Sequence, residues 1–102
     1  MEKLGKGIVG ATIRVTITKD GAVWDLTGAT VELRYEKPSG VGGTWAPTIT
    51  DPVAGKVEYV TVEGDIDESD TYKLEPFVTQ GALQNAPGDI VKFFVFPILT
   101  GT

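Results

Sequence analysis

A run of strictly alternating residues in the middle of the chain constrains the fold most. Residues 30–36 read Thr-Val-Glu-Leu-Arg-Tyr-Glu, so Val31, Leu33 and Tyr35 fall at every second position between polar side chains. Because successive side chains of a strand point to opposite faces of its sheet, this pattern predicts a β-strand with one buried and one solvated face. Pro38 has no N–H to donate to a ladder and Gly40 tolerates positive φ, so a turn is expected to follow.

A corner is expected immediately before this strand. Residues 25–28 read Asp-Leu-Thr-Gly, and Leu26 is the apolar side chain among them. Gly28 lets the chain bend because it adopts positive φ without strain. We expect Leu26 to point into the core at this corner. Trp24, just before it, is also expected to pack in the core, the commoner position of a tryptophan in a small β domain.

Similar segments recur along the chain. Besides the central strand, strands are expected at residues 11–18, 23–24, 44–50, 56–62, 71–80 and 90–99, with a hairpin loop at residues 81–88. Asp20 and Gly21 between the first two of these are a hairpin signal, and the 13 glycines and six prolines favour turns over long helices. The sequence therefore predicts an all-β fold, in which residues 1–102 form a single β-sandwich of about seven antiparallel strands and residues 1–7 are a mobile lead-in.

The net charge and the missing residue types exclude several functions. The net charge is −5 and the nine Lys and Arg residues are scattered, so neither nucleic acid nor an anionic membrane is an expected partner. The chain has no His and no Cys, which removes the usual nucleophile–base pairs and zinc ligand sets. Catalysis by two carboxylates stays open in principle, but a domain of this size makes a deep cleft with difficulty. We expect no enzyme activity and no cofactor.

The start of the chain bears on where the protein is made. Residues 1–11 contain basic residues but no sustained apolar run after them. A secretory signal peptide requires such a run, so we expect a soluble protein that is made in the cytoplasm.

The stretch richest in carboxylates is a candidate metal site. Residues 63–70 contain five acidic side chains and no cation, and calcium prefers several oxygen ligands from one loop. Asp65, Asp67 and Asp70 are the candidate ligands. An EF-hand loop would need glycine at the position of Asp70, so we expect a solvated acidic loop that holds no metal.

The two tryptophans allow a different binding hypothesis. Aromatic rings stack on apolar surfaces, and an indole N–H is easily satisfied at the rim of a site. Trp24 and Trp45 could therefore serve a small carbohydrate-binding module, although core packing is the more common outcome.

The last predicted strand carries large apolar side chains on both faces. Val91, Phe93 and Val95 share one face, and Phe94, Phe96 and Ile98 share the other. A strand with one wet face should not carry phenylalanine on both. Either the strand is covered on both sides within the domain, or its outer face meets a partner. On the second interpretation Phe94, Phe96 and Ile98 are the interface residues.

A tyrosine after the acidic stretch resembles a feature of immunoglobulin-like sandwiches. Tyr72 begins an alternating strand directly after a turn, as the tyrosine of their tyrosine corner does, and it would bond back to the upstream backbone. Leu74 stands where antibody domains carry a cysteine, so the chain is not an antibody domain.

The order of motifs along residues 11–95 resembles one family more closely. The Asp-Gly turn is followed by Val-Trp-Asp-Leu-Thr-Gly-Ala-Thr-Val-Glu-Leu, Lys-Pro-Ser-Gly, Gly-Lys-Val-Glu-Tyr and then the strand with Tyr72. Together these resemble the immunoglobulin-like domain at the start of phage baseplate upper proteins and of related small tail proteins. The longer members carry helical and receptor-facing regions that this sequence lacks, which suggests a stand-alone accessory piece.

This resemblance implies a function in assembly. We expect a non-enzymatic virion structural protein of immunoglobulin-like fold, an accessory component of a tail or baseplate that acts through protein–protein contacts. Its partners would be other virion proteins or copies of itself in a larger symmetric assembly. A capsid decoration protein of the same fold and a carbohydrate-binding module are the alternatives.

Overall fold

The structure is a computed structural model that describes residues 4–96. This part of the chain forms eleven strands and no helix, which confirms the all-β prediction. The strands are β1 (Leu4–Gly5), β2 (Thr12–Thr16), β3 (Thr18–Lys19), β4 (Ala22–Val23), β5 (Ala29–Glu36), β6 (Gly42–Trp45), β7 (Thr48–Asp51), β8 (Lys56–Val60), β9 (Asp70–Gln80), β10 (Leu83–Pro87) and β11 (Val91–Phe96). Accordingly, residues 4–96 include no helix long and apolar enough to cross a membrane.

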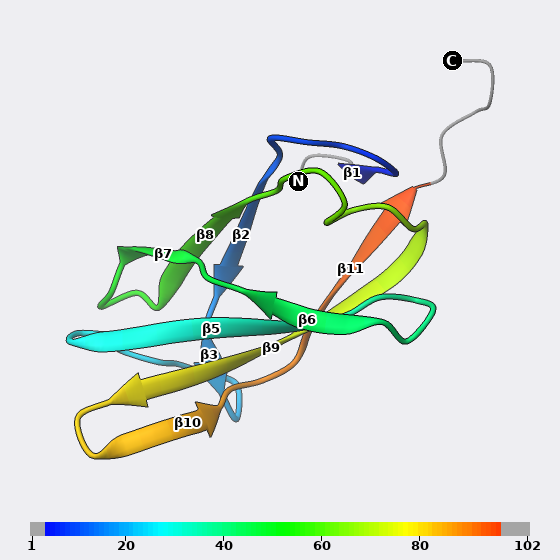
Figure 1. The fold of residues 1–102 in the computed structure, drawn as a ribbon. Coiled ribbons are helices and arrows are strands. Elements are labelled where there is room, and N and C mark those ends of the chain that lie inside the picture. Colours follow the sequence, from blue (N-terminus) through cyan, green and yellow to red (C-terminus); the bar gives the residue numbers. More distant parts are fainter. Residues whose placement is uncertain (1–3, 97–102) are drawn as a thin grey trace, which may run out of the picture.

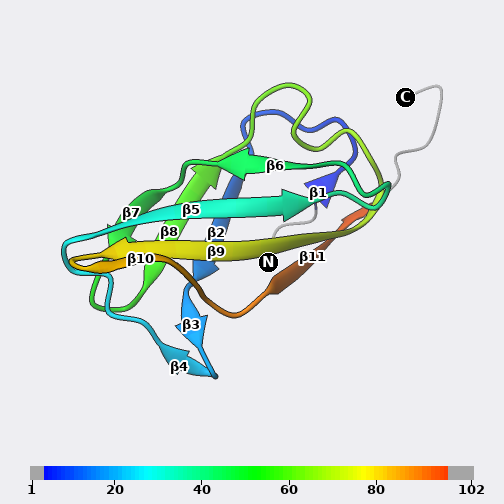
Figure 2. The same cartoon turned by 60° about the horizontal axis from the view of Figure 1, so that its bottom comes forward.

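The strands are arranged in two layers (Figure 1). The larger sheet has the order β1-β11-β9-β5-β6, with β10 beside the far part of β9, and the smaller sheet has the order β2-β8-β7. Strands β3 and β4 form a separate two-stranded hairpin. Figure 2 shows the smaller sheet lying behind β5 and β9, as expected of a β-sandwich.

The core lies between the two sheets and is built from the alternate residues of each strand. The smaller sheet contributes three buried side chains to this core: Ile13 and Val15 on β2, and Val57 on β8. The larger sheet contributes buried Leu33, Trp45, Tyr72, Leu74, Val78 and Val95 to the same cluster. The alternation that predicts the strands from sequence is thus the alternation that fills the core.

The predicted corner before β5 is present. The Leu26 side chain is 1% exposed, and its amide donates to the Pro52 carbonyl at 2.7 Å. The Ala29 amide donates to the Leu26 carbonyl at 2.9 Å, and Gly28 takes a φ of 73°. The turn therefore buries Leu26 and sends the chain into β5.

Tyr72, near the start of β9, is part of the buried core. Its ring is fully buried and stacks on Phe93 with a centroid distance of 5.2 Å. The backbone amide of Glu68 donates to the Tyr72 hydroxyl oxygen at 3.1 Å, which is the upstream backbone contact that the sequence predicts. This bond fixes the acidic stretch against the start of β9.

Tyr72→Phe should lower the free energy of unfolding by about 1 kcal/mol, and by up to about 3 kcal/mol if the Glu68 amide is left dry. The substitution keeps the ring and removes the acceptor of one hydrogen bond. Chemical denaturation monitored by circular dichroism measures the difference. An unchanged denaturation midpoint would show that this hydrogen bond contributes nothing.

The structure contains more strands than the seven expected. Residues 44–50 form two strands in different sheets, because the chain crosses from β6 to β7 at Ala46 and Pro47. Residues 81–88, expected as a loop, contain β10, which pairs with β9. The first predicted strand divides into β2 and β3 around the buried Ile17.

Residues 4–7, expected to be a mobile lead-in, form strand and backbone contacts in the structure. Leu4 and Gly5 form β1, which pairs with β11 in parallel and departs from the all-antiparallel prediction. The amides of Lys6 and Gly7 donate to the carbonyls of Phe96 and Ile66. These contacts use the backbone, so the polar, glycine-rich composition of the segment gives no sign of them.

Asp89 holds the β3–β4 hairpin to the connection between β10 and β11. One carboxylate oxygen accepts from the Thr18 hydroxyl at 2.8 Å and the Gly21 amide at 2.9 Å, and the other accepts from the Asp20 amide at 3.0 Å. The bonds from the Gly21 amide, the Thr18 hydroxyl and the Asp20 amide hold the pKa of Asp89 below its usual value. The predicted Asp-Gly turn is thus capped by a distant carboxylate.

Candidate interaction surface

The outer face of β11 carries an exposed aromatic pair. Phe94 and Phe96 are 47% and 39% exposed, and their rings meet edge to face with centroids 4.8 Å apart. Phe93 and Val95 point the other way, and Val95 is fully buried. The strand is therefore apolar on both faces, with its inner face buried in the core and Phe94 and Phe96 partly exposed on its outer face. Ile98, the third predicted interface residue, lies outside the described residues.

Charged side chains lie next to this pair on the outer face of the larger sheet. Lys92 lies directly opposite Lys73 of β9, and Lys73 lies directly opposite Glu36 of β5. The Lys73 ammonium is 3.8 Å from the Glu36 carboxylate. Lys92 makes no ion pair within residues 4–96. The aromatic pair thus borders a mixed-charge surface with one unneutralised lysine.

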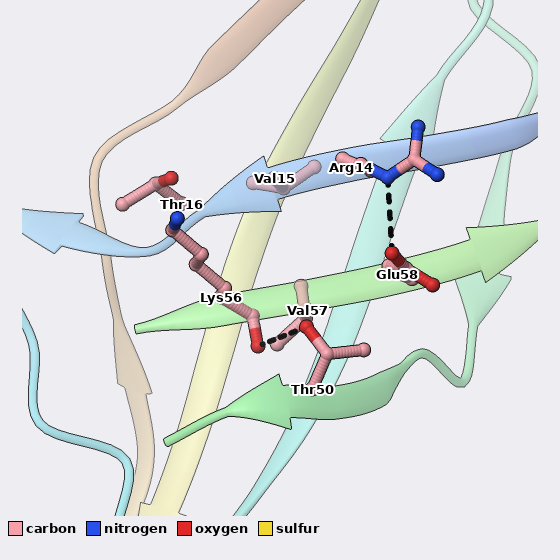
Figure 3. Close-up of a pocket in the computed structure, with 7 residues that line it drawn as sticks. All are labelled: Arg14, Val15, Thr16, Thr50, Lys56, Val57 and Glu58. Carbon is pink, nitrogen blue, oxygen red and sulfur yellow. Dashed lines mark hydrogen bonds and ion pairs between the residues drawn. The ribbon is translucent and has the colours of Figure 1, made fainter. Parts of the chain in front are cut away.

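Two shallow pockets lie on the outer faces of the sheets. One, of about 340 Å³, lies at the Lys73–Glu36 ion pair and is lined by Arg34, Tyr35, Glu36, Lys73, Glu75 and Ile90. The other, of about 410 Å³, is on the smaller sheet and is lined by Arg14, Val15, Thr16, Thr50, Lys56, Val57 and Glu58 (Figure 3).

The pocket in Figure 3 lacks the groups that carboxylate catalysis needs. Its one carboxylate, Glu58, accepts from Arg14 Nε at 3.0 Å, and the Thr50 hydroxyl donates to the Lys56 carbonyl at 3.3 Å. Hydrolysis of a glycoside requires two carboxylates that face the same bond. The arrangement offers a polar surface rather than an acid–base pair.

The structure separates the three carboxylates that were candidate metal ligands. Asp65 accepts from Trp45 Nε1 at 3.2 Å, from the Tyr59 hydroxyl at 2.7 Å and from the Val62 amide at 2.8 Å. Asp67 pairs with Lys37, and Asp70 accepts from the Thr71 amide at 2.8 Å. In residues 4–96 no group of three or more acidic side chains is placed to hold a metal ion.

Adding calcium should leave the melting temperature unchanged. The three aspartates already accept hydrogen bonds from different donors, so a cation would have to break these bonds to gather them. Thermal unfolding with millimolar calcium and with a chelator tests this. A shift of several degrees that the chelator reverses would contradict it, because a bound ligand stabilises the native state.

Lys37 ties the turn after β5 to the acidic stretch. Its side chain is 8% exposed, and Nζ donates to Asp67 at 2.6 Å and to the Gly64 carbonyl at 2.9 Å. Burial alone would lower the pKa of Lys37, but the hydrogen bond and charge of Asp67 outweigh it and raise this pKa. The hydrogen bond from Lys37 lowers the pKa of Asp67. The pairing therefore stabilises the fold above the usual Asp67 value of 3.8 and below the usual Lys37 value of 10.5, and is lost beyond the shifted values on either side.

Asp67→Ala should cost about 1–3 kcal/mol of stability at pH 7, whereas Lys37→Met should cost less than about 1 kcal/mol. The first substitution leaves a buried ammonium without its counter-ion. The second removes the buried charge and leaves a half-exposed carboxylate in water. Denaturation midpoints of the two variants measure the asymmetry, and a larger loss for Lys37→Met would overturn this explanation.

The two tryptophans offer little surface for stacking on a sugar. Trp45 is 3% exposed and stacks on Tyr59 with centroids 4.6 Å apart. Burial and the bond to Asp65 raise the pKa of Tyr59 to about 12. Trp24 is half-buried, and its Nε1 donates to the Gln80 side chain at 3.2 Å. Both indole N–H groups are thus used within the domain.

Two residues around these sites, Lys37 and Lys92, were missed by prediction from the sequence. Lys37 has a signal: it continues the inward phase of Val31, Leu33 and Tyr35, so alternation places a lysine on the buried face, where it needs a partner. Lys92 has none, because its lack of a counter-ion depends on the pairing of β11 with β9.

A comparison with protein families gives a match, and a search of curated proteins gives no relative. The match is to the sequence model of the BppU N-terminal domain, over residues 10–101, nearly the whole chain. This domain is the N-terminal domain of baseplate upper proteins, in agreement with the resemblance drawn from the motif order. The chain therefore belongs to the family of BppU N-terminal domains, which are domains of the phage baseplate.

Proposed function

We propose that this domain is a non-enzymatic structural component of a phage tail or baseplate, and that it is held there through the outer face of β11. The observation that carries the proposal is the exposed Phe94–Phe96 pair in a member of a baseplate family. Exposed aromatic pairs of this kind are characteristic of protein interfaces, where a few buried aromatic anchors supply most of the affinity.

The rest of the described surface supports assembly over catalysis. The two pockets described above are shallow, and the carboxylates of Asp65 and Asp67 already accept hydrogen bonds from Trp45, Tyr59 and Lys37. The partners are accordingly other virion proteins, with the apolar rings as the contact.

Mass spectrometry of fractionated particles tests the location. The chain should be present in tails and baseplates that have been separated from capsids. Recovery in the capsid fraction alone would favour a decoration protein instead, and absence from purified particles would reject a virion role.

A further inference from the structure

One edge of β11 is only partly covered. On the side away from β9, β1 pairs with Val95 and Phe96, and the Lys6 amide donates to the Phe96 carbonyl at 3.0 Å. Residues 91–94 have no strand partner on this side within the described part of the chain. Figure 1 shows β1 only at the far end of β11. We call residues 91–94 on this side the free edge.

The backbone groups at the free edge can be assigned. The N–H and C=O of a strand residue point to the same side, and this side alternates along the strand. Because Phe96 bonds to the β1 side, Phe94 and Lys92 also direct their N–H and C=O to that side. The free edge therefore presents donors and acceptors in the spacing of a β-ladder, which is a template for another strand.

The side chains at this edge indicate what kind of strand fits. On the outer face, Lys92 lies beside Lys73 and lacks a counter-ion within residues 4–96, and Phe94 lies two residues further along. On the inner face, Val91 and Phe93 are only partly buried. A neighbouring strand would place its side chains about 5 Å from these residues. An acidic residue beside Lys92 and apolar residues beside Phe94 and Phe93 would complement them.

A second copy of the chain fits this edge poorly. In an antiparallel pairing of two β11 strands, the register centred on Lys92 places the two lysines directly opposite one another, which is unfavourable. A register centred on Phe93 carries the second strand into the position that β1 occupies beside Val95. These two registers disfavour pairing of β11 with a second β11, so we infer that the added strand belongs to a different chain.

We propose that the free edge of β11 accepts an extended strand of another virion protein, with Asp or Glu beside Lys92 and an apolar residue beside Phe94. The added strand continues the larger sheet where β1 stops, and it covers the Phe94–Phe96 pair at the edge of that sheet. This inference rests on the proposed function and specifies the form of the partner.

Zero-length carbodiimide cross-linking of purified particles tests the pairing. Lys92 should become linked to an Asp or Glu in an alternating polar–apolar segment of a different protein, and Lys92→Arg should incorporate normally without that link. A link from Lys92 to a second copy of this chain, or no Lys92 link in particles that contain the chain, would overturn the proposal.

Two further variants separate strand addition from side-chain contact alone. Phe94→Pro removes the amide at the free edge but no ladder bond to β9, so it should reduce incorporation at least tenfold below Phe94→Ala. Lys92→Glu should also reduce incorporation at least tenfold, and it covers the case in which the proline variant fails to fold. Equal incorporation of Phe94→Pro and Phe94→Ala, together with normal incorporation of Lys92→Glu, would reject strand addition and leave the proposed function standing. Absence of the wild-type chain from particles would reject both.

Discussion

Gly55→Ala should lower the free energy of unfolding by about 2–5 kcal/mol, the largest loss we expect from any single methyl group in this domain. Gly55 has a φ of 68°, where an L-residue is strained, and an added Cβ would lie 2.7 Å from the Trp24 carbonyl oxygen and 2.9 Å from that of Ile17. The Ile17 carbonyl cannot move easily, because it accepts from the Trp24 amide at 3.0 Å. The Ile17 amide also donates to the Gly55 carbonyl at 2.7 Å.

Gly81→Ala is the matched control. Gly81 has a φ of 58° but nothing within 4 Å of an added Cβ, so its substitution should cost only the backbone strain, about 1–2 kcal/mol. Urea denaturation of both variants gives the comparison. Equal losses would show that the close carbonyl contacts at Gly55 have no energetic weight.

Phe94→Ser combined with Phe96→Ser should leave the domain folded and reduce its incorporation into particles about 100-fold or more. Covering each ring is worth roughly 1.5–3 kcal/mol, and 1.4 kcal/mol corresponds to a tenfold change in affinity. The fold should survive because both rings already face solvent on the outer side of β11. Circular dichroism and quantitative mass spectrometry of particles measure the two effects.

Val53→Ser combined with Val60→Ser is the control for general loss of apolar surface. These valines are 68% and 54% exposed and lie away from β11, so their replacement should leave incorporation unchanged. Unfolding of the double phenylalanine variant would place the rings in the core and remove the interface from β11.

The strands that the sequence predicts well are those with one buried face. In β5, β8 and β9 the apolar phase read from the sequence coincides with the buried side chains Leu33, Val57 and Tyr72. The Leu26 corner and the Asp-Gly turn follow from local residue preferences, which act within a few residues.

The missed features depend on pairing between distant segments. Asp89 caps the β3–β4 hairpin, although it lies 71 residues after its partner Thr18 in the sequence. No local sequence pattern indicates such a bond. β1 and β10 are held chiefly by backbone ladders, which are insensitive to composition. Phe94 and Phe96 could be assigned to one face from their phase, but their exposure depends on whether another segment covers that face.

Hydroxyl-radical footprinting of Phe94 and Phe96 tests the central claim most directly, because it reports whether another chain covers the outer face of β11. Both rings should be oxidised readily in the isolated domain and be protected at least tenfold in assembled particles, while the oxidation of Val53 stays unchanged. Equal oxidation of the two rings in the isolated domain and in particles would contradict the assignment of this face as the interface.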